Sequence, residues 1–494
     1  MYSNLGSWTG RAKRLVGIGL VAGVLAACHG NVLDVKDPDN VQPSQLTGPS
    51  SVSNVSHGVI GDFREMYDNY VRYTGLLTDE FELAGTFPTR REVDFRSINS
   101  DNQTLTDELF TPLQVTRTSA DAVVPRFQNA KSNPEFADVT DELDQGIVWG
   151  KLYGGYDRLL FAEAYCQSIF SSPVEESSPV LPVDRAKEAQ TVLQDAESLA
   201  SAASMTGEQE AAIVGQARAL MFQGQYQQAA SLVSSIPTDF TYLVNYSDNQ
   251  TDEENEVYQL TWNHILALRW TVGDGTNAAR LNESWPYLNE WMSQGLLVPP
   301  SQHDLVAFGS SSWPVYLQTV YGGVDPSPSS NPGGKVRTGA ASNASMLLAS
   351  GWEARMIEAE AQLRAGSYAL ANSTVNDLLT ESTQVDNPIR QINSNVPFGA
   401  FSPVDFSPDS SFEANIKQLA RARAAGMWIS GTRLGFLRRL ALNDNIDLYP
   451  PKIDADGNVV GQDIAFPVVK QEIDNNSNIS AACPNNPNHS APWR

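Results

Sequence analysis

Cys28 is the first residue of the chain whose surroundings suggest chemistry at its side chain. It follows three basic residues at positions 11–14 and a largely apolar run over 15–27, which ends in a leucine and two alanines. Basic residues followed by a short apolar run and small residues are typical of a secretory signal. The run is shorter than the roughly 18 to 20 residues that a permanent membrane-spanning helix needs. We therefore expect residues 1–27 to be cleaved as a signal peptide.

The residues before Cys28 also predict what happens to its thiol. Leu25, Ala26, Ala27 and Cys28 resemble the bacterial lipobox, in which the cysteine is acylated and becomes the first residue of the mature protein. Several acyl chains are needed for a stable anchor, because each buried methylene contributes only about 0.8 kcal/mol. The sequence favours a lipidated Cys28, and an ordinary signal peptide with a chance cysteine is the alternative.

Two further cysteines, Cys166 and Cys483, follow in the mature chain. Outside the reducing cytosol such a pair indicates a disulfide. The bridge would connect the carboxyl-terminal tail to an early helix and contribute roughly 2 to 4 kcal/mol to stability. Two separate thiols are the alternative.

No pattern of polar residues predicts catalysis. The histidines are nowhere at metal-ligand spacing, and no G-x-S-x-G nucleophile elbow is present. Adjacent acids such as Asp79 with Glu80 and Glu253 with Glu254 fit a solvated acidic surface better than a glycosidase pair. Residues 454–458 (DADGN) resemble part of a calcium loop but lack its full ligand spacing, and the tip of a β-hairpin is favoured instead. We expect no enzymatic activity, no cofactor and no metal site.

Two long loops hold the side chains best suited to bind a ligand. They cover residues 83–104 and 307–338 and are rich in aromatic rings, with arginine and amide groups in the first. Flat rings suit the apolar faces of sugars, and Arg and Asn bond hydroxyl or carboxylate groups. We expect a pocket where the loops meet, and the alternative is that the rings anchor the loops to the helical body. The candidates are Phe87, Arg90, Arg91, Asn99, Trp313, Tyr316 and Tyr321.

The mature chain is strongly acidic. Removing residues 1–27 takes away three basic residues and no acidic ones, which leaves 30 Lys and Arg against 57 Asp and Glu and a net charge of −27. Such a surface repels phosphate backbones and anionic headgroups, so nucleic acid is excluded as a partner and membrane attachment falls to the lipid. The apolar content of 41% is typical of a globular protein.

The organisation of the chain follows from its apolar spacing. Residues 28–50 are polar with several prolines and predict an extended tether, and residues 51–494 predict a single helical body. A long helix is expected from Val52 to about Asp79, and the segments at 145–170 and 184–204 predict an antiparallel pair.

Two later stretches share the pattern G-x-Y-x-x-A. Gly224, Tyr226 and Ala229 form the first copy, and Gly366, Tyr368 and Ala371 form the second. In each, a helix ends at the glycine and a second helix begins at the tyrosine, as in tetratricopeptide-type repeats. Two unrelated helical hairpins that share a turn are the alternative.

Four landmarks in order resemble the SusD/RagB family of nutrient-uptake lipoproteins of the bacterial outer membrane. The lipobox comes first, and the segment EARMIEAEAQLRAGSYALANSTVNDLL resembles the central hallmark of the family. The segment GTRLGFLRRL and the terminal FPVVKQEIDNN resemble its late signatures. The matching residues are Leu33, Asp34, Pro38, Asn376, Gly431, Arg433, Leu437, Phe466, Pro467, Glu472 and Asn476. The chain departs at Gly435, where an Asp is usual, and at 420–425, where Ala and Arg replace acids.

The resemblance implies a mainly α protein built from tetratricopeptide-like helix pairs, with long loop insertions and a few short β-hairpins. It further implies a lipid-anchored protein of the outer membrane, facing the cell surface, which binds a glycan or peptide and delivers it to a SusC-like TonB-dependent transporter. A tetratricopeptide-type interaction scaffold without a small-ligand site of its own is the alternative. A receptor needs a solvent-facing pocket with flat rings, whereas a scaffold needs a groove of helices.

Overall fold

The structure is a computed structural model, and the chain divides into two units, Met1–Ser51 and Val52–Arg494. In the first unit only residues 47–51 are described, and they include the short 3₁₀ turn η3 (Pro49–Ser51). The predicted signal peptide and Cys28 lie outside the described residues. The described ranges are 47–83, 87–170, 178–250, 253–260, 270–273, 297–298, 315–318, 342–380, 386–394, 399–449, 452–453, 459–479 and the single residues 287, 290 and 293.

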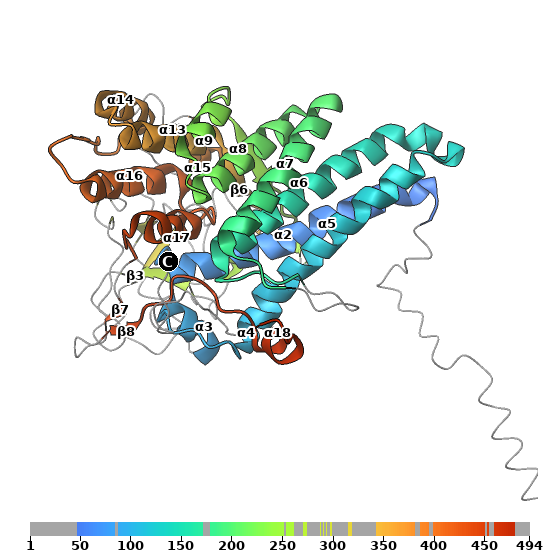
Figure 1. Ribbon diagram of the computed structural model, residues 1–494, viewed down its shortest axis with the longest axis horizontal. Helices are drawn as coiled ribbons and strands as arrows, with labels where there is room; N and C mark the ends of the chain where they lie inside the picture. The colour runs from blue at the N-terminus through green and yellow to red at the C-terminus, as the bar shows by residue number, and fades with distance from the viewer. Residues whose placement is uncertain are drawn as a thin grey trace, which may run out of the picture. The chain divides into compact units, whose positions relative to one another are not determined.

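The second unit begins with long helices that pack side by side (Figure 1). The predicted first helix is confirmed as α2 (Val52–Leu77), and it packs against α5 (Thr111–Ala130) and α6 (Thr140–Ala164). The predicted pair is α6 with α7 (Pro182–Ala202), and α7 in turn packs against α8 (Thr206–Phe222). The second half of α6 is buried almost all round, because α2, α5, α7 and α8 all contact it.

Both G-x-Y-x-x-A stretches form the predicted helix pairs. The first pair is α8 with α9 (Tyr226–Val233), and the second is α13 (Gly351–Arg364) with α14 (Tyr368–Leu379). The glycines between them have φ angles of +77° at Gly224 and +74° at Gly366, a region that costs other residues free energy.

The two pairs are far apart in sequence but neighbours in space. Helix α9 packs against α13, and Gln227 Nε2 donates a hydrogen bond of 2.9 Å to the Ala361 carbonyl. The Arg364 guanidinium lies 3.6 Å from the centre of the Tyr226 ring. The strands β2 (Thr241–Val244) and β6 (Met346–Ser350) pair antiparallel. The long insertion between the two helix pairs therefore begins and ends at two strands that are paired with each other.

The structure contains a small four-stranded sheet in addition to the short hairpins that were predicted. Its order is β1-β3-β5-β4, formed by β1 (Glu82–Leu83), β3 (Trp270–Gly273), β5 (Val315–Gln318) and β4 (Leu297–Val298). Strands of two to four residues that pair across such distances leave no local sequence pattern. The hairpin predicted around 454–458 is confirmed by the antiparallel pair β7 (Lys452–Ile453) and β8 (Val459–Gly461), while its tip lies outside the described residues.

The remaining described elements are short connections and the late helices. The prediction of a loop over 83–104 is wrong at 88–94, which forms α3 (Pro88–Asp94), because Pro88 starts the helix and Val93 packs into the core. It is also wrong at 103–104, which begin a second short helix. The other elements are α4 (Gln103–Leu105), the π-helical turn η4 (Thr106–Phe110), η5 (Pro134–Val139), α10 (Glu256–Tyr258), α15 (Pro388–Ile392), α16 (Phe412–Met427), α17 (Arg433–Asp444) and α18 (Lys470–Asn475). Across the described ranges, none of the helices combines the length and the apolar character of a membrane span.

Candidate functional site

The first group of predicted ligand residues lies on and beside α3. The Phe87 side chain directly before α3 is 44% exposed, whereas Arg90 in the first turn is buried. The Arg90 guanidinium lies over the Phe87 ring, with its central carbon 4.9 Å from the ring centre. A cation held against an aromatic face stabilises the position of the ring, so Phe87 offers an exposed flat surface of defined orientation.

A carboxylate from another element holds Arg90 in place. Arg90 Nη2 lies 2.9 Å from Oε1 and 3.1 Å from Oε2 of Glu108 in η4. The Tyr73 hydroxyl on α2 donates a hydrogen bond to the same carboxylate, and Arg72 Nη2 lies 4.0 Å from it. Glu108 therefore joins α2, α3 and η4 and fixes the guanidinium that supports Phe87.

Arg72 connects this cluster to α10. Its Nη1 atom lies 3.4 Å from Glu256 Oε2, and the Glu256 amide donates a hydrogen bond of 3.2 Å to Asp68 Oδ2. Burial raises the pKa of Asp68 to about 7, although Arg72 opposes the shift. The charge of this carboxyl group therefore changes close to neutral pH.

The other predicted residues are only partly placed. Arg91 is half-buried on α3, and Asn99 is exposed, with its main-chain amide 3.2 Å from Glu92 Oε2. Tyr316 belongs to β5, while Trp313 and Tyr321 lie outside the described residues. Strand β3 pairs with both β1, which ends where the first predicted loop begins, and β5, which lies within the second predicted loop. The pocket between the loops stays a prediction.

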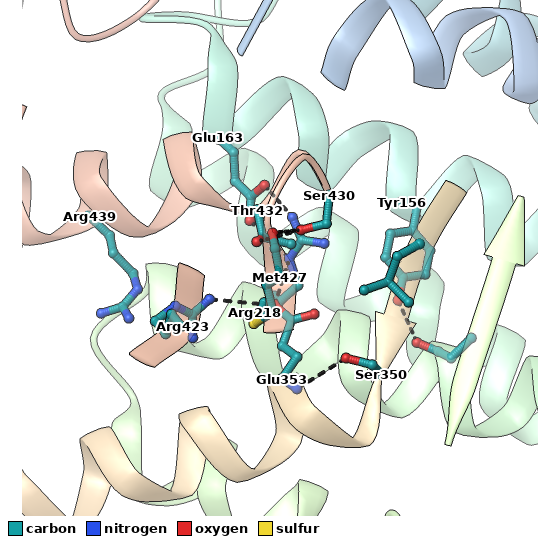
Figure 2. A network of polar contacts seen from close by, with 12 residues as sticks. Tyr156, Glu163, Arg218, Ser350, Glu353, Arg423, Met427, Ser430, Thr432 and Arg439 are labelled. Atoms are coloured by element: carbon teal, nitrogen blue, oxygen red, sulfur yellow. Dashed lines mark hydrogen bonds and ion pairs between the residues drawn. The ribbon is translucent and has the colours of Figure 1, made fainter. Parts of the chain in front are cut away.

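A second polar cluster is buried between α6, α8, α13 and α16 (Figure 2). Arg218 Nη2 lies 2.6 Å from Glu163 Oε2, and Arg218 Nε lies 3.5 Å from Glu353 Oε1. Arg423 Nη2 lies 3.8 Å from the same Glu353 oxygen. Burial raises the pKa of Glu353, with Arg218 and Arg423 opposing the shift, and burial lowers the pKa of Arg423 to about 10.

The cluster extends to α17 through a third guanidinium, that of Arg439. Arg439 Nη1 lies 2.6 Å from Glu360 Oε1, and Arg364 Nη2 lies 2.9 Å from the same oxygen. Arg364 also contacts Asp444, with an Nη2–Oδ2 distance of 2.6 Å. Burial alone would raise the pKa of Glu360, but Arg439 and Arg364 hold it at about 2. These ion pairs join α13 to α17, so the cluster stabilises the packing of helices.

The space inside the buried cluster is too small for a nutrient. The cavity inside the cluster has a volume of about 20 Å³, and its lining includes Arg218, Arg423, Arg439, Glu163 and Glu353. That volume holds about one water molecule. Within the ranges that the structure describes, no group of three His, Cys, Asp or Glu residues is placed to bind a metal ion. The exposed Phe87 ring, directly before α3, is therefore the better candidate for ligand contact.

The fold of the chain matches that of solved structures. A SusD superfamily protein of Bacteroides vulgatus aligns over 88% of this chain and 98% of its own, with a TM-score of 0.58 and 12% identity. The chain has the SusD fold. A SusD superfamily protein of Bacteroides thetaiotaomicron aligns over 88% of this chain and 99% of its own, with a TM-score of 0.57 and 13% identity.

A third similar structure is described as a candidate sugar-binding protein of Bacteroides vulgatus. It aligns over 87% of this chain and 97% of its own, with a TM-score of 0.57 and 12% identity. No protein-family model and no curated protein sequence matches the chain. The likeness therefore lies in the fold, as the resemblance predicted, and individual residue roles do not follow from it.

Gly435, the departure noted in the sequence, has a clear structural counterpart. A Cβ atom at this position would lie 2.4 Å from Glu163 Cδ, so any side chain there would displace the Glu163 carboxylate. Glu163 Oε2 pairs with Arg218 and also accepts a hydrogen bond of 3.4 Å from the Tyr70 hydroxyl. In this chain α6 supplies the carboxylate next to position 435, where the family resemblance leads us to expect an Asp.

The structure describes only one of the two cysteines in the predicted disulfide. Cys166 lies two residues after the end of α6 and is disulfide-bonded. The other two cysteines, Cys28 and Cys483, lie outside the described residues. The pairing of Cys166 with Cys483 stays a prediction.

Sequence reasoning missed the buried ion pairs. Glu353 and Glu360 are seven residues apart, two helical turns, on the buried face of α13. Charged residues at the spacing of a buried face were the available signal, but their partners on α16 and α17 come from the tertiary structure.

Proposed function

We propose that this protein is a surface lipoprotein that binds a nutrient for uptake. The observation that carries the proposal is the SusD fold over nearly nine tenths of the chain, preceded in the sequence by a signal layout and a lipobox ending at Cys28. Lipid on Cys28 would hold the protein at the outer membrane, facing the cell surface. A SusC-like TonB-dependent transporter would be the partner that imports the ligand.

The proposed ligand is a glycan or a peptide. One protein with the same fold is described as a candidate sugar-binding protein, which supports the glycan class. The exposed Phe87 ring, fixed by Arg90, suits stacking against the apolar face of a sugar ring or an aromatic ligand group. The strongly acidic chain disfavours a highly anionic ligand. We propose binding without catalysis.

We further propose that the ligand contacts come from the two predicted loops. Phe87 is the described residue best placed for contact, with Trp313, Tyr316 and Tyr321 as candidates from the second loop. Arg90 is assigned a positioning role, because Glu108 already occupies its guanidinium. Replacing Arg90 would therefore disturb α3 as well as any ligand.

The test screens glycan and peptide arrays against the soluble chain that begins after Cys28. Phe87→Ala should weaken binding of the selected ligand about 2- to 12-fold, equivalent to the roughly 0.5–1.5 kcal/mol of an aromatic contact. Leu181→Ala is the matched control, because Leu181 is 47% exposed and lies before α7, away from α3 in sequence. No binding of either ligand class at millimolar concentration would contradict the proposal. Equal binding by the Phe87 variant and the parent would show that the ligand binds at another site.

A further inference from the structure

The segment 402–407 crosses between α14 and α16 in an unusual way. It forms no strand ladder, yet every main-chain N–H and C=O group from Ser402 to Ser407 is hydrogen-bonded to a side chain, Pro403 having no N–H. Buried main-chain groups are normally satisfied by other main-chain groups. This segment is instead bound by the surrounding side chains as a ligand would be.

Helix α14 binds the main chain of Val404 and Phe406. The Val404 amide donates to Asn376 Oδ1 at 2.8 Å, and Asn376 Nδ2 donates back to the Val404 carbonyl at 2.9 Å. Asn372, one helical turn earlier, bonds Phe406 in the same two-way manner at 2.7 and 2.9 Å. Two asparagines four residues apart on α14 therefore match two residues that are two apart along the segment.

Helix α16 binds the main chain of Asp405 and Ser407 in the same manner. Gln418 bonds the amide and the carbonyl of Asp405 at 2.8 and 3.0 Å. Asn415 bonds the amide and the carbonyl of Ser407 at 3.1 and 2.9 Å. The amide groups of these four side chains take the place of the neighbouring strands on both sides of an extended chain, in which successive residues point their N–H and C=O groups to opposite sides.

The amino-terminal end of the segment is held by charged groups. Arg421 Nη2 donates to the carbonyls of Ser402 and Pro403 at 2.6 and 3.1 Å. The Ser402 amide donates to Glu290 Oε1 at 3.0 Å, and Arg421 Nη1 lies 2.8 Å from the same oxygen. The binding groups thus continue along α16 by a further helical turn.

The side chains of the segment set a simple sequence requirement. Val404 and Phe406 are buried, whereas Asp405 is exposed. All the polar recognition is directed at the main chain. The groove therefore requires apolar residues two apart and tolerates any residue between them.

We propose that the groove between α14 and α16 is a binding site for an extended polypeptide, occupied in this structure by residues 402–407 of the same chain. The partner of this groove is an extended segment of another polypeptide. It carries two apolar residues separated by one residue of any type. Because the binding groups of α14 and α16 are side chains, both helices keep their own main-chain hydrogen bonds when the segment leaves. The site is separate from the nutrient contacts proposed on α3.

The test uses the full mature chain with residues 402–407 replaced by alternating glycine and serine. A fluorescein-labelled peptide with the sequence of residues 399–410 is titrated and followed by fluorescence anisotropy. We expect saturable binding. Methylation of the two peptide nitrogens that correspond to Val404 and Phe406 should weaken it at least tenfold, because both N–H donors to α14 are lost. Asp405→Asn in the peptide should change the affinity by less than twofold.

Matched variants of the protein locate the peptide. Asn376→Ala should weaken binding at least fivefold, while Ser373→Ala, an exposed position on the same helix, should not. No binding to a folded variant, or binding indifferent to N-methylation, would overturn the proposal. If the variant does not fold, the wild-type chain is used instead. The same peptide then carries benzophenone at position 406, and its photocrosslinks to the protein are mapped. Crosslinks within α14 or α16 support the proposal, and their absence at millimolar peptide overturns it.

Discussion

At the scale of single residues, Glu163 on α6 supplies the carboxylate that pairs with Arg218. Glu163 fills the space that a side chain at position 435 would take. Arg218 is buried, and it depends on that carboxylate because an unpaired buried charge is strongly destabilising. The two positions are therefore coupled energetically.

We predict that Gly435→Asp destabilises the fold by about 3 kcal/mol or more, since overpacking costs roughly 1–3 kcal/mol and two carboxylates would then share one site. Gly435→Ala isolates the steric part. In the double variant with Glu163→Ala, the new Asp can pair with Arg218, so the loss should be smaller than the sum of the single losses by about 1 kcal/mol or more. Urea unfolding of the four proteins measures this coupling, and strict additivity would contradict it.

A second residue-scale prediction concerns Glu80. It is 2% exposed, and its Oε1 atom accepts a hydrogen bond of 3.1 Å from the Ile429 amide. Burial raises its pKa from 4.5 to about 7, with Arg433 opposing the shift. The folded state therefore binds more protons than the unfolded state between these two values, and this group's contribution to stability falls as the pH rises from about 4.5 to about 7.

Glu80→Gln should remove this pH dependence, because glutamine keeps the acceptor and does not titrate. We expect the variant to exceed the parent in unfolding free energy by up to about 3 kcal/mol at pH 8 and to equal it near pH 4. Urea unfolding at pH 4, 6 and 8 measures the difference. The exposed Glu135→Gln is the control. Parallel pH curves for Glu80→Gln and the parent would refute the assignment.

At the scale of elements, the G-x-Y-x-x-A turns decide how the helix pairs close. Gly224 and Gly366 adopt left-handed φ angles of +77° and +74°. We predict that alanine at either position costs about 1–2 kcal/mol and that asparagine costs less. Gly207→Ala in α8 is the control, because its new Cβ would lie 3.8 Å from the Tyr242 ring, an ordinary contact. Thermal unfolding compares the variants, and equal effects at all three glycines would be inconsistent with the turn geometry.

At the scale of the whole molecule, the disulfide of Cys166 links this residue to a part of the chain that is distant in sequence. We predict Cys483 as its partner, and Cys483→Ser should then lower the unfolding free energy by roughly 2–4 kcal/mol. Mass spectrometry of non-reduced tryptic peptides identifies the linked pair. A linkage of Cys166 to Cys28 would contradict both the predicted bridge and lipidation of Cys28, because that thiol would be consumed.

The sequence by itself determined the elements whose signals are local. Apolar spacing predicted α2 and the pairs of α6 with α7, α8 with α9, and α13 with α14, because a helix buries one face at a period that is visible in the chain. The order of the landmarks predicted the SusD fold. Composition predicted a globular and acidic protein.

Only the tertiary structure decided which distant residues meet. The ladder of α14 and α16 around residues 402–407, the ion pairs of Glu353 and Glu360, and the sheet β1-β3-β5-β4 join segments far apart in the chain. The seven-residue helix α3 was too short to show a period, so its support of Phe87 through Arg90 and Glu108 was equally hidden. Such contacts depend on packing, and packing is not encoded in the spacing of any one segment.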